Sequence, residues 1–258
     1  MATKVALVTA SSAGLGAAIA KSLSPSFRVV INYFSRPEKA AEIVKECEAL
    51  CSLTNEPDPA PPSPRFHTIQ ADVSKRSEIQ RLVKETIETM GRLDVVVSNA
   101  GWTRLTTFAN LDEQLVEEDW DECFKVNVKS HLWILAAAKP YLEASEDGGS
   151  FITVASLAGV RPGGSSLPYS VTKAAQIHLT KGLAMICGPQ IRCNAVSPGL
   201  MLTEWGQKFP ESKIKATADK GMLKRLATVE DVADQVRTLA ANKSMTGQNI
   251  VLDCGIAV

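Results

Sequence analysis

The sequence predicts a doubly wound α/β fold built on a seven-stranded parallel sheet with helices on both faces. Short runs rich in β-branched residues recur along the chain and are apolar on successive positions, which is typical of strands covered on both faces. Helical patterns separate these runs, so each connection is a right-handed crossover between parallel strands. We expect strands at residues 4–9, 28–33, 67–71, 94–98, 150–155, 191–196 and 249–252, and helices at 15–23, 38–50, 77–90, 119–141, 169–186 and 229–240.

Four of the runs show the strand pattern most clearly. They read KVALVT at residues 4–9, RVVINY at 28–33, DVVVS at 94–98 and SFITVA at 150–155. Their β-branched content and their length of four to six residues favour strands over helices.

The alternation of strands and helices continues through residues 1–258 without a linker or an internal repeat, so we expect a single domain. One segment departs from the pattern. Residues 51–65, CSLTNEPDPAPPSPR, contain five of the 13 prolines and no apolar periodicity. Because a loop can lengthen at little cost in free energy, we interpret this segment as an exposed surface insertion.

The composition argues against several classes of function. Lys plus Arg and Asp plus Glu each number 28, and this balance gives no net field that would attract a nucleic acid or an anionic membrane. The longest apolar run, residues 132–138, is far shorter than the ~20 residues that a spanning helix needs. No secretory signal precedes the first strand, so we expect a cytoplasmic protein. Its six cysteines should be reduced thiols, and their spacing fits no metal site.

A glycine-containing turn follows the first strand. Residues 9–16 read TASSAGLG and lead into the first predicted helix. Such a turn lets backbone N–H groups approach a pyrophosphate, and the helix N-terminus adds positive potential. The residues predicted to form this site are Thr9, Ser11, Ser12, Gly14, Leu15 and Gly16.

The end of the second strand indicates which nucleotide is bound. A carboxylate there would bind the ribose hydroxyls of NAD, whereas an arginine favours the 2′-phosphate of NADP. The chain reads Tyr33-Phe34-Ser35-Arg36 and has no acid before Glu38. Because Arg36 and the Ser35 hydroxyl could hold a phosphate through charge-assisted hydrogen bonds, the sequence favours NADP(H).

Tyr169 and Lys173 lie four residues apart in a predicted helix, which puts a phenol and an ammonium on one face. A phenol with a pKa of ~10 transfers protons poorly at neutral pH, and a nearby cation lowers that pKa. Ser156 follows the fifth strand and could donate a hydrogen bond to a carbonyl. These three residues predict proton transfer at a substrate carbonyl oxygen.

Together these motifs resemble the short-chain dehydrogenase/reductase family over essentially the whole chain. The turn at residues 9–16 is similar to the family's T-G-x-x-x-G-x-G sequence, with Ala10 in place of the first glycine. An alanine costs about 1 kcal/mol there if the backbone has a positive φ. Further similar segments are Asp72-Val73, Ser98-Asn99-Ala100-Gly101 and Asn194-Ala195-Val196-Ser197-Pro198-Gly199, followed by Thr203.

The resemblance implies hydride transfer between NADP(H) and a carbonyl–alcohol pair. Ser156 would orient the carbonyl oxygen and Tyr169 would exchange a proton with it. Lys173 would lower the pKa of Tyr169 and hold the nicotinamide ribose, and Asn127 would hold a water that relays protons. The remaining residues expected to contact the cofactor are Asp72, Val73, Asn99, Ala100, Gly101, Pro198, Gly199, Met201 and Thr203.

The segment 200–221 corresponds to the family's substrate lid, and its apolar residues, with Trp102, favour a lipophilic or aromatic ketone. We therefore predict an NADPH-dependent reductase of a small ketone that uses no metal and forms a homo-oligomer, a tetramer or a dimer. Two alternatives stay open: an NAD(P)-dependent alcohol dehydrogenase that works oxidatively, and a catalytically silent NADP-binding scaffold or sensor. Cyclisation or epimerisation on the same fold also stays open.

Overall fold

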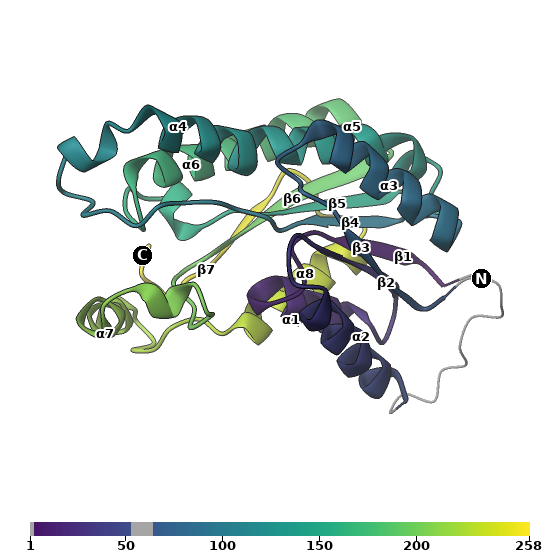
Figure 1. Cartoon of the computed structure of the whole chain (residues 1–258), viewed down its shortest axis with the longest axis horizontal. Helices are drawn as coiled ribbons and strands as arrows, with labels where there is room; N and C mark the ends of the chain where they lie inside the picture. The colour runs from purple at the N-terminus through teal and green to yellow at the C-terminus, as the bar shows by residue number, and fades with distance from the viewer. Residues whose placement is uncertain (1–2, 53–63) are drawn as a thin grey trace.

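In the residues that the computed structural model describes, 3–52 and 64–258, seven strands form one parallel sheet (Figure 1). Their order across the sheet is β3-β2-β1-β4-β5-β6-β7. This arrangement confirms the predicted fold class. The strands are β1 Val5–Val8, β2 Arg28–Tyr33, β3 Phe66–Gln70, β4 Val95–Ser98, β5 Gly149–Val154, β6 Ile191–Pro198 and β7 Asn249–Leu252.

Helices cover both faces of this sheet. They are α1 Gly14–Leu23, α2 Pro37–Ser52, α3 Arg76–Met90, α4 Glu117–Phe124, α5 Ser130–Glu143, α6 Leu167–Cys187, α7 Glu211–Lys220 and α8 Val229–Ala241. Figure 1 shows α1, α2 and α8 on one face and α3, α5 and α6 on the other, which is the expected doubly wound arrangement. The helix α7 lies apart from both layers (Figure 1).

The central strand β1 is buried on both faces, which is why it is apolar on successive positions. Val5 and Leu7 pack in the core layer beneath α3, α5 and α6, whereas Ala6 and Val8 pack against α1, α2 and α8. All four side chains are fully buried. Because alternate residues of a strand point to opposite faces, both positions must be apolar when both faces are covered.

The helix predicted at residues 119–141 contains an irregular turn. The helix α4 continues through η2 (Lys125–Lys129), a π-helical turn, into α5. Asn127 lies in this turn and is fully buried. A π-turn is wider than an α-helical turn and is common at functional positions, and apolar periodicity does not reveal it.

The lid segment also contains structure that was not predicted. It forms the short helix η4 (Gly206–Lys208) and the helix α7. The helix α7 buries no side chain among the described residues, so it lacks the apolar stripe that identifies a helix in sequence.

The predicted surface insertion falls largely outside the described residues, which omit 53–63. At its edges, Cys51 lies in the last turn of α2, and Arg65 donates to the carbonyls of Ser24 and Pro25.

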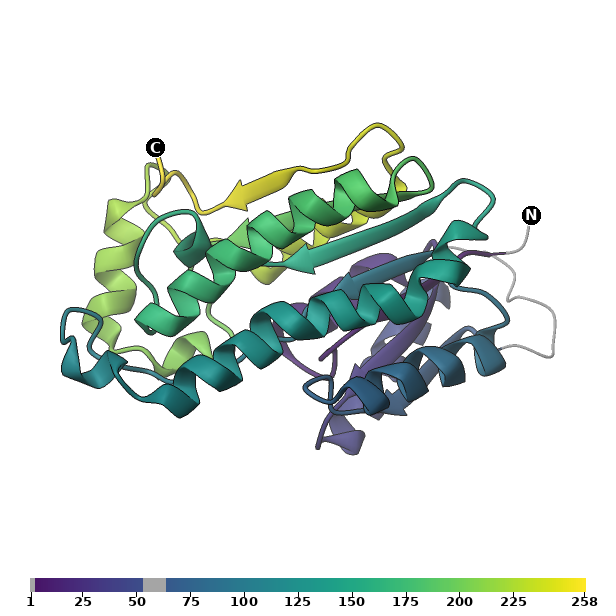
Figure 2. The same cartoon turned by 90° about the horizontal axis from the view of Figure 1, so that it is seen from above.

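The carboxyl ends of the strands meet at one edge of the sheet, and the predicted site residues follow those ends. The strand β1 lies between β2 and β4, so the connections after β1 and β4 lead to helices on opposite faces and leave a crevice between them. Figure 2 shows α7 and the segment before α4 at this end of the molecule. Within the described part of the chain, none of the helices has the length and apolar character that crossing a bilayer demands.

Candidate active site

The turn between β1 and α1 depends on left-handed backbone and on close packing. Ala10 has a φ of 50° and Gly14 a φ of 55°. At Gly16 a Cβ atom would lie 2.4 Å from the carbonyl oxygen of Ala10, so only glycine fits. The alanine that replaces the family's first glycine therefore adopts the positive φ that glycine tolerates better, at a cost of about 1 kcal/mol.

Two asparagines hold this turn against the sheet. Asn32 in β2 accepts a hydrogen bond from the N–H of Ala10 (3.0 Å) and donates to the carbonyl of Ile69 (3.2 Å). Asn99, after β4, donates to the carbonyls of Thr9 (3.0 Å) and Ala10 (3.2 Å). Asn32 was not among the predicted site residues, although a polar residue within the apolar run RVVINY was a visible indication.

The hydroxyls of Thr9 and Ser11 also support the turn. Thr9 Oγ1 accepts from the N–H groups of Asn99 (2.9 Å) and Ala100 (3.3 Å), and Ser11 Oγ donates to the carbonyl of Val8 (2.8 Å). Both side chains are fully buried. They therefore brace the turn from inside instead of facing the crevice.

Arg36 lies beyond the end of β2 and is paired with an acid from the lid. Its guanidinium donates to Glu204 (Nη1 to Oε2, 2.7 Å), and Lys39 of α2 forms a second ion pair with the same carboxylate. Hydrogen bonds from Lys39 and Arg36 lower the pKa of Glu204 to about 2. The sequence indicated Arg36 alone, whereas in the structure both Arg36 and Lys39 lie at this position and share the Glu204 carboxylate.

Asp72 follows β3 and bonds to its own turn. Its carboxylate accepts from the N–H of Ser74 (3.0 Å) and lies 3.4 Å from the Lys75 ammonium. Partial burial opposes ionisation, but the hydrogen bonds from Ser74 and the nearby Lys75 hold the pKa of Asp72 below its ordinary value. Tyr33 ends β2, and Ser35 is exposed next to Arg36.

A cavity of about 420 Å³ lies beyond the ends of β4, β5 and β6. The structure brings many of the predicted residues together on its wall, whereas the side chains of Leu15, Val73 and Ala100 are buried elsewhere in the core. The predicted residues that line the cavity are Asn99, Gly101, Ser156, Tyr169, Lys173, Pro198, Gly199, Met201 and Thr203.

Ser156 and Tyr169 form the polar centre of this cavity. Ser156 follows β5, Tyr169 lies in the first turn of α6, and both side chains line the cavity. Burial raises the pKa of Tyr169 to about 12, and the nearby Ser156 hydroxyl opposes that rise. The phenol is therefore protonated at neutral pH and can donate a hydrogen bond or a proton.

Lys173 lies one turn further along α6 and is almost completely buried. Its ammonium donates to the carbonyl of Val154 and to Gln176 Oε1, both at 2.8 Å. Burial lowers the pKa of Lys173 to about 7. Burial and the Ser156 hydroxyl are the main causes of the shift in the pKa of Tyr169, and the expected effect of Lys173 on that pKa stays a prediction. The ammonium, 5.6 Å from the centre of the phenol ring, bonds to those neutral acceptors and itself loses its proton near neutrality.

Asn127 braces the segment after β4 against α6. Its Oδ1 accepts from the N–H of Trp102 (2.7 Å), and its Nδ2 donates to the carbonyl of Trp102 (2.9 Å) and to Thr172 Oγ1 (3.1 Å). A Cβ on Gly101 would lie 3.5 Å from both Asn127 Oδ1 and the Lys173 ammonium. The water relay expected at Asn127 stays a prediction.

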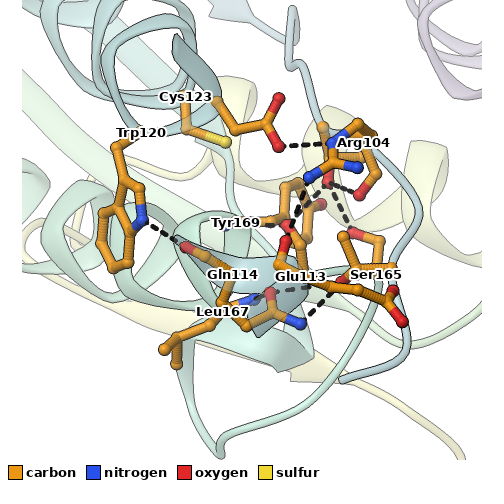
Figure 3. Close-up of polar contacts among 12 residues, drawn as sticks. Arg104, Glu113, Gln114, Trp120, Cys123, Ser165, Leu167 and Tyr169 are labelled. Atoms are coloured by element: carbon orange, nitrogen blue, oxygen red, sulfur yellow. Dashed lines mark hydrogen bonds and ion pairs between the residues drawn. The ribbon is translucent and has the colours of Figure 1, made fainter. Parts of the chain in front are cut away.

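Polar contacts hold the segment between β4 and α4 against the start of α6 (Figure 3). Gln114 is buried, and its Oε1 accepts from the N–H of Leu167 (3.0 Å) while its carbonyl accepts from the Trp120 indole (2.8 Å). Ser166 caps the helix by accepting from the N–H of Tyr169 (3.3 Å). Sequence reasoning missed both supports. The serine just before Leu-Pro at the helix start was a recognisable cap, but nothing marks a buried loop glutamine.

A phenol, a serine hydroxyl and a buried lysine at the strand ends of a doubly wound sheet define a class of enzyme. The chain belongs to the short-chain dehydrogenase/reductase family and is an oxidoreductase of that family. A family model described as enoyl-(acyl carrier protein) reductase matches residues 9–257.

Three relatives show how far the similarity extends. A protein named as a ketoacyl reductase of the granaticin polyketide synthase of Streptomyces violaceoruber is 37% identical over 254 residues, 97% of this chain and 95% of the relative. The 3-oxoacyl-[acyl-carrier-protein] reductase FabG of Thermotoga maritima is 31% identical over 258 residues, 99% of this chain and 98% of the relative. A short-chain dehydrogenase from Burkholderia cenocepacia, solved in complex with NADP, matches with a TM-score of 0.86 and 30% identity over 100% of this chain and 99% of that one.

Replacing Ala10 with glycine should stabilise the fold, because the strained φ of 50° would be relieved. We expect Ala10→Gly to raise the free energy of unfolding by about 1 kcal/mol, or the Tm by roughly 2–4 °C. As a control, Ala41→Gly, at an exposed position inside α2, should lower stability by about as much. A loss of stability in both variants would show that Ala10 is not strained.

Replacing Lys173 with methionine should stabilise the unliganded protein at neutral pH. The pKa of Lys173 is lowered from 10.5 to about 7, so the folded state carries a penalty for its charge that is fully present below about pH 7 and fades as pH rises toward 10.5. We expect Lys173→Met to unfold at higher urea concentration than the unmodified chain at about pH 7, with the gap closing by about pH 10.

Lys181→Met is the matched control, because Lys181 is an exposed residue of the same helix. Its effect should be small and independent of pH. A pH-independent gain in Lys173→Met would contradict a buried charge as the cause.

Proposed function

We propose that the chain is an NADPH-dependent carbonyl reductase that transfers hydride to a ketone, with Tyr169 as the proton donor. The observation that carries this proposal is that Ser156, Tyr169 and Lys173 line one cavity, with Lys173 one helical turn from Tyr169. Two hydroxyls that converge in this way suit an oxygen atom that gains negative charge in the transition state. The named ketoacyl reductases among the relatives support the same reaction.

The crevice suits a dinucleotide with a 2′-phosphate. Gly14 and Gly16 keep side chains out of the turn that opens α1, where a pyrophosphate would approach the helix N-terminus. Arg36 and Lys39 present two cations beyond the end of β2, and they would hold the 2′-phosphate. The NADP bound in the similar Burkholderia structure supports this choice. When bound, NADPH supplies the hydride.

The residues of the chain supply binding, orientation and the proton. Ser156 holds the carbonyl oxygen, and Tyr169 donates its proton to that oxygen as the alkoxide develops. A phenol with a pKa of about 12 is a weak acid, so its proton leaves readily only toward a strongly basic alkoxide. A charged Lys173 beside the ring would favour that transfer, and its place beside Gly101 would let it hold the nicotinamide ribose hydroxyls.

We propose further that the protein works in the cytoplasm as a homo-oligomer, a tetramer or a dimer. Exposed apolar side chains on the outer faces of α5 and α6 support association. The exposed side chains are Tyr141, Val171, Met185 and Ile186, and the last two are exposed by 86% and 74%.

The apolar part of the cavity wall supports an aromatic or lipophilic substrate, because Trp205 and Phe209 meet there edge to face at 5.3 Å. The complete set of Ser156, Tyr169 and Lys173 favours an enzyme over a silent scaffold.

Tyr169→Phe should lose nearly all ketone reduction while retaining NADPH binding, because it removes the proton donor and little else. We expect turnover to fall by roughly 10²–10⁴-fold in an assay of NADPH consumption with a panel of ketones. Tyr141→Phe, on the exposed face of α5, is the control and should keep its turnover. Undiminished reduction by Tyr169→Phe would refute the assignment.

Glu204→Gln should tighten NADPH binding, since the lid carboxylate would no longer neutralise Arg36 and Lys39. We expect roughly a tenfold lower Kd for NADPH at low salt, with little change for NADH, which lacks the 2′-phosphate. Arg36→Ala should weaken the binding of NADPH and leave the binding of NADH nearly unchanged.

Glu211→Gln removes the same charge from an exposed position at the start of α7 and serves as the control. An equal gain in NADPH affinity in Glu211→Gln would mean that the change in the protein's net charge alone tightens binding. No gain in Glu204→Gln would place the 2′-phosphate away from these two cations.

A further inference from the structure

The wall of the cavity combines apolar side chains with polar side chains from the lid helix α7. Trp102, Leu200, Trp205 and Phe209 contribute aromatic and aliphatic surface, as expected for a lipophilic ketone. The helix α7 also borders the cavity, but it does so with polar residues. This contrast bears on the chemical class of the substrate.

The face of α7 that borders the cavity is basic. Lys213, Thr217 and Lys220 are the residues of this helix that line the cavity, and their spacing of four and three residues puts them on one stripe. Arg161, from the segment after η3 (Leu157–Gly159), adds a third cation to the rim. A lid over a purely apolar ligand would present apolar side chains on this stripe.

The contacts of Lys213 and Arg161 place their charged groups at the cavity. The Lys213 ammonium donates to the carbonyl of Gly164 (3.0 Å) and lies 4.4 Å from the centre of the Phe209 ring. Arg161 donates from Nη1 to the carbonyl of Ile256 (2.7 Å). Gly164, Phe209 and Ile256 all line the cavity. Lys213 is an exposed residue, and partial desolvation at the cavity rim lowers the pKa of its ammonium.

No carboxylate balances these charges within residues 3–52 and 64–258. Neither Asp nor Glu occurs among the described residues that line the cavity, and Arg161, Lys213 and Lys220 form no ion pair there. Arg36 and Lys39, at the other end of the crevice, do share a carboxylate. The whole chain has no net charge, so the positive potential at the cavity is a local feature.

We propose that the substrate is an organic anion, a ketone with an apolar body and a carboxylate that Lys213, Lys220 and Arg161 bind. This proposal rests on the proposed ketone reduction and names the substrate class of the same site. The ketone oxygen would lie at Ser156 and Tyr169, and the apolar body along Trp205 and Phe209. The carboxylate would face the basic stripe of α7, where charge-assisted hydrogen bonds select it over a neutral ester.

The test compares keto acids with their own methyl esters. We would measure kcat/KM at saturating NADPH for para-acetylbenzoate and levulinate, each beside its methyl ester. The acid should be preferred within at least one pair by about tenfold or more, chiefly through KM, and added salt should reduce this preference. Lys213→Met should lower the acid-to-ester ratio of kcat/KM by about tenfold.

Lys215→Met is the control, because Lys215 is an exposed residue of α7 outside the basic stripe. It should leave the ratio unchanged. Two results would overturn the carboxylate proposal and leave ketone reduction standing. The first is reduction of the esters as efficiently as the acids, and the second is an equal fall in kcat/KM for acid and ester in Lys213→Met. Failure of every ketone, neutral or charged, to consume NADPH would overturn the proposed function and this inference with it.

Discussion

The site depends on a lysine ammonium that is buried with neutral oxygen atoms as its hydrogen-bond partners. Lys173 donates to the end of β5 at Val154 and to Gln176 on its own helix. Burying a charge without an opposite charge is expensive, so the surroundings must hold the group firmly. They do so through close packing: a Cβ on Gly159 would lie 2.5 Å from the Lys173 main chain. The pKa of about 7 is the consequence, and it makes the lysine responsive to any group that binds beside it.

The charges of the crevice are divided between two ends. At one end Arg36 and Lys39 meet Glu204, which belongs to the lid, so the two cations are neutralised within the protein. At the other end Lys213 and Lys220 border the cavity with no acid among its described lining residues. The lid therefore contributes a carboxylate near the proposed phosphate site and ammonium groups near the proposed substrate. A chain without net charge can in this way favour anions at both ends of one crevice.

Much of the fold and of the candidate site could be predicted from the sequence, because short-range patterns determine the strands, the helices and the spacing of several site residues. Strands buried on both faces read as apolar runs, and β1 and β2 were predicted within a residue or two. Tyr169 and Lys173 share a helical spacing, and Ser156 follows a predicted strand end as the family resemblance implies, so their meeting in one cavity could be expected. The features that escaped prediction depend on tertiary contacts. Glu204 lies 165 residues from Lys39, and the acceptors of Lys173 depend on how α6 packs on β5. The φ of Ala10 follows from the turn geometry that Asn32 and Asn99 impose.

The central claim is that hydride passes from the cofactor to a ketone carbon while Tyr169 supplies the proton. The most direct measurement is the fate of deuterium when the protein reduces an unsymmetrical ketone with NADPH that carries deuterium at both C4 positions of the nicotinamide. We predict an alcohol that carries one deuterium on its carbinol carbon, in one enantiomer. An alcohol without deuterium on that carbon, or consumption of the ketone without oxidation of NADPH, would contradict the account.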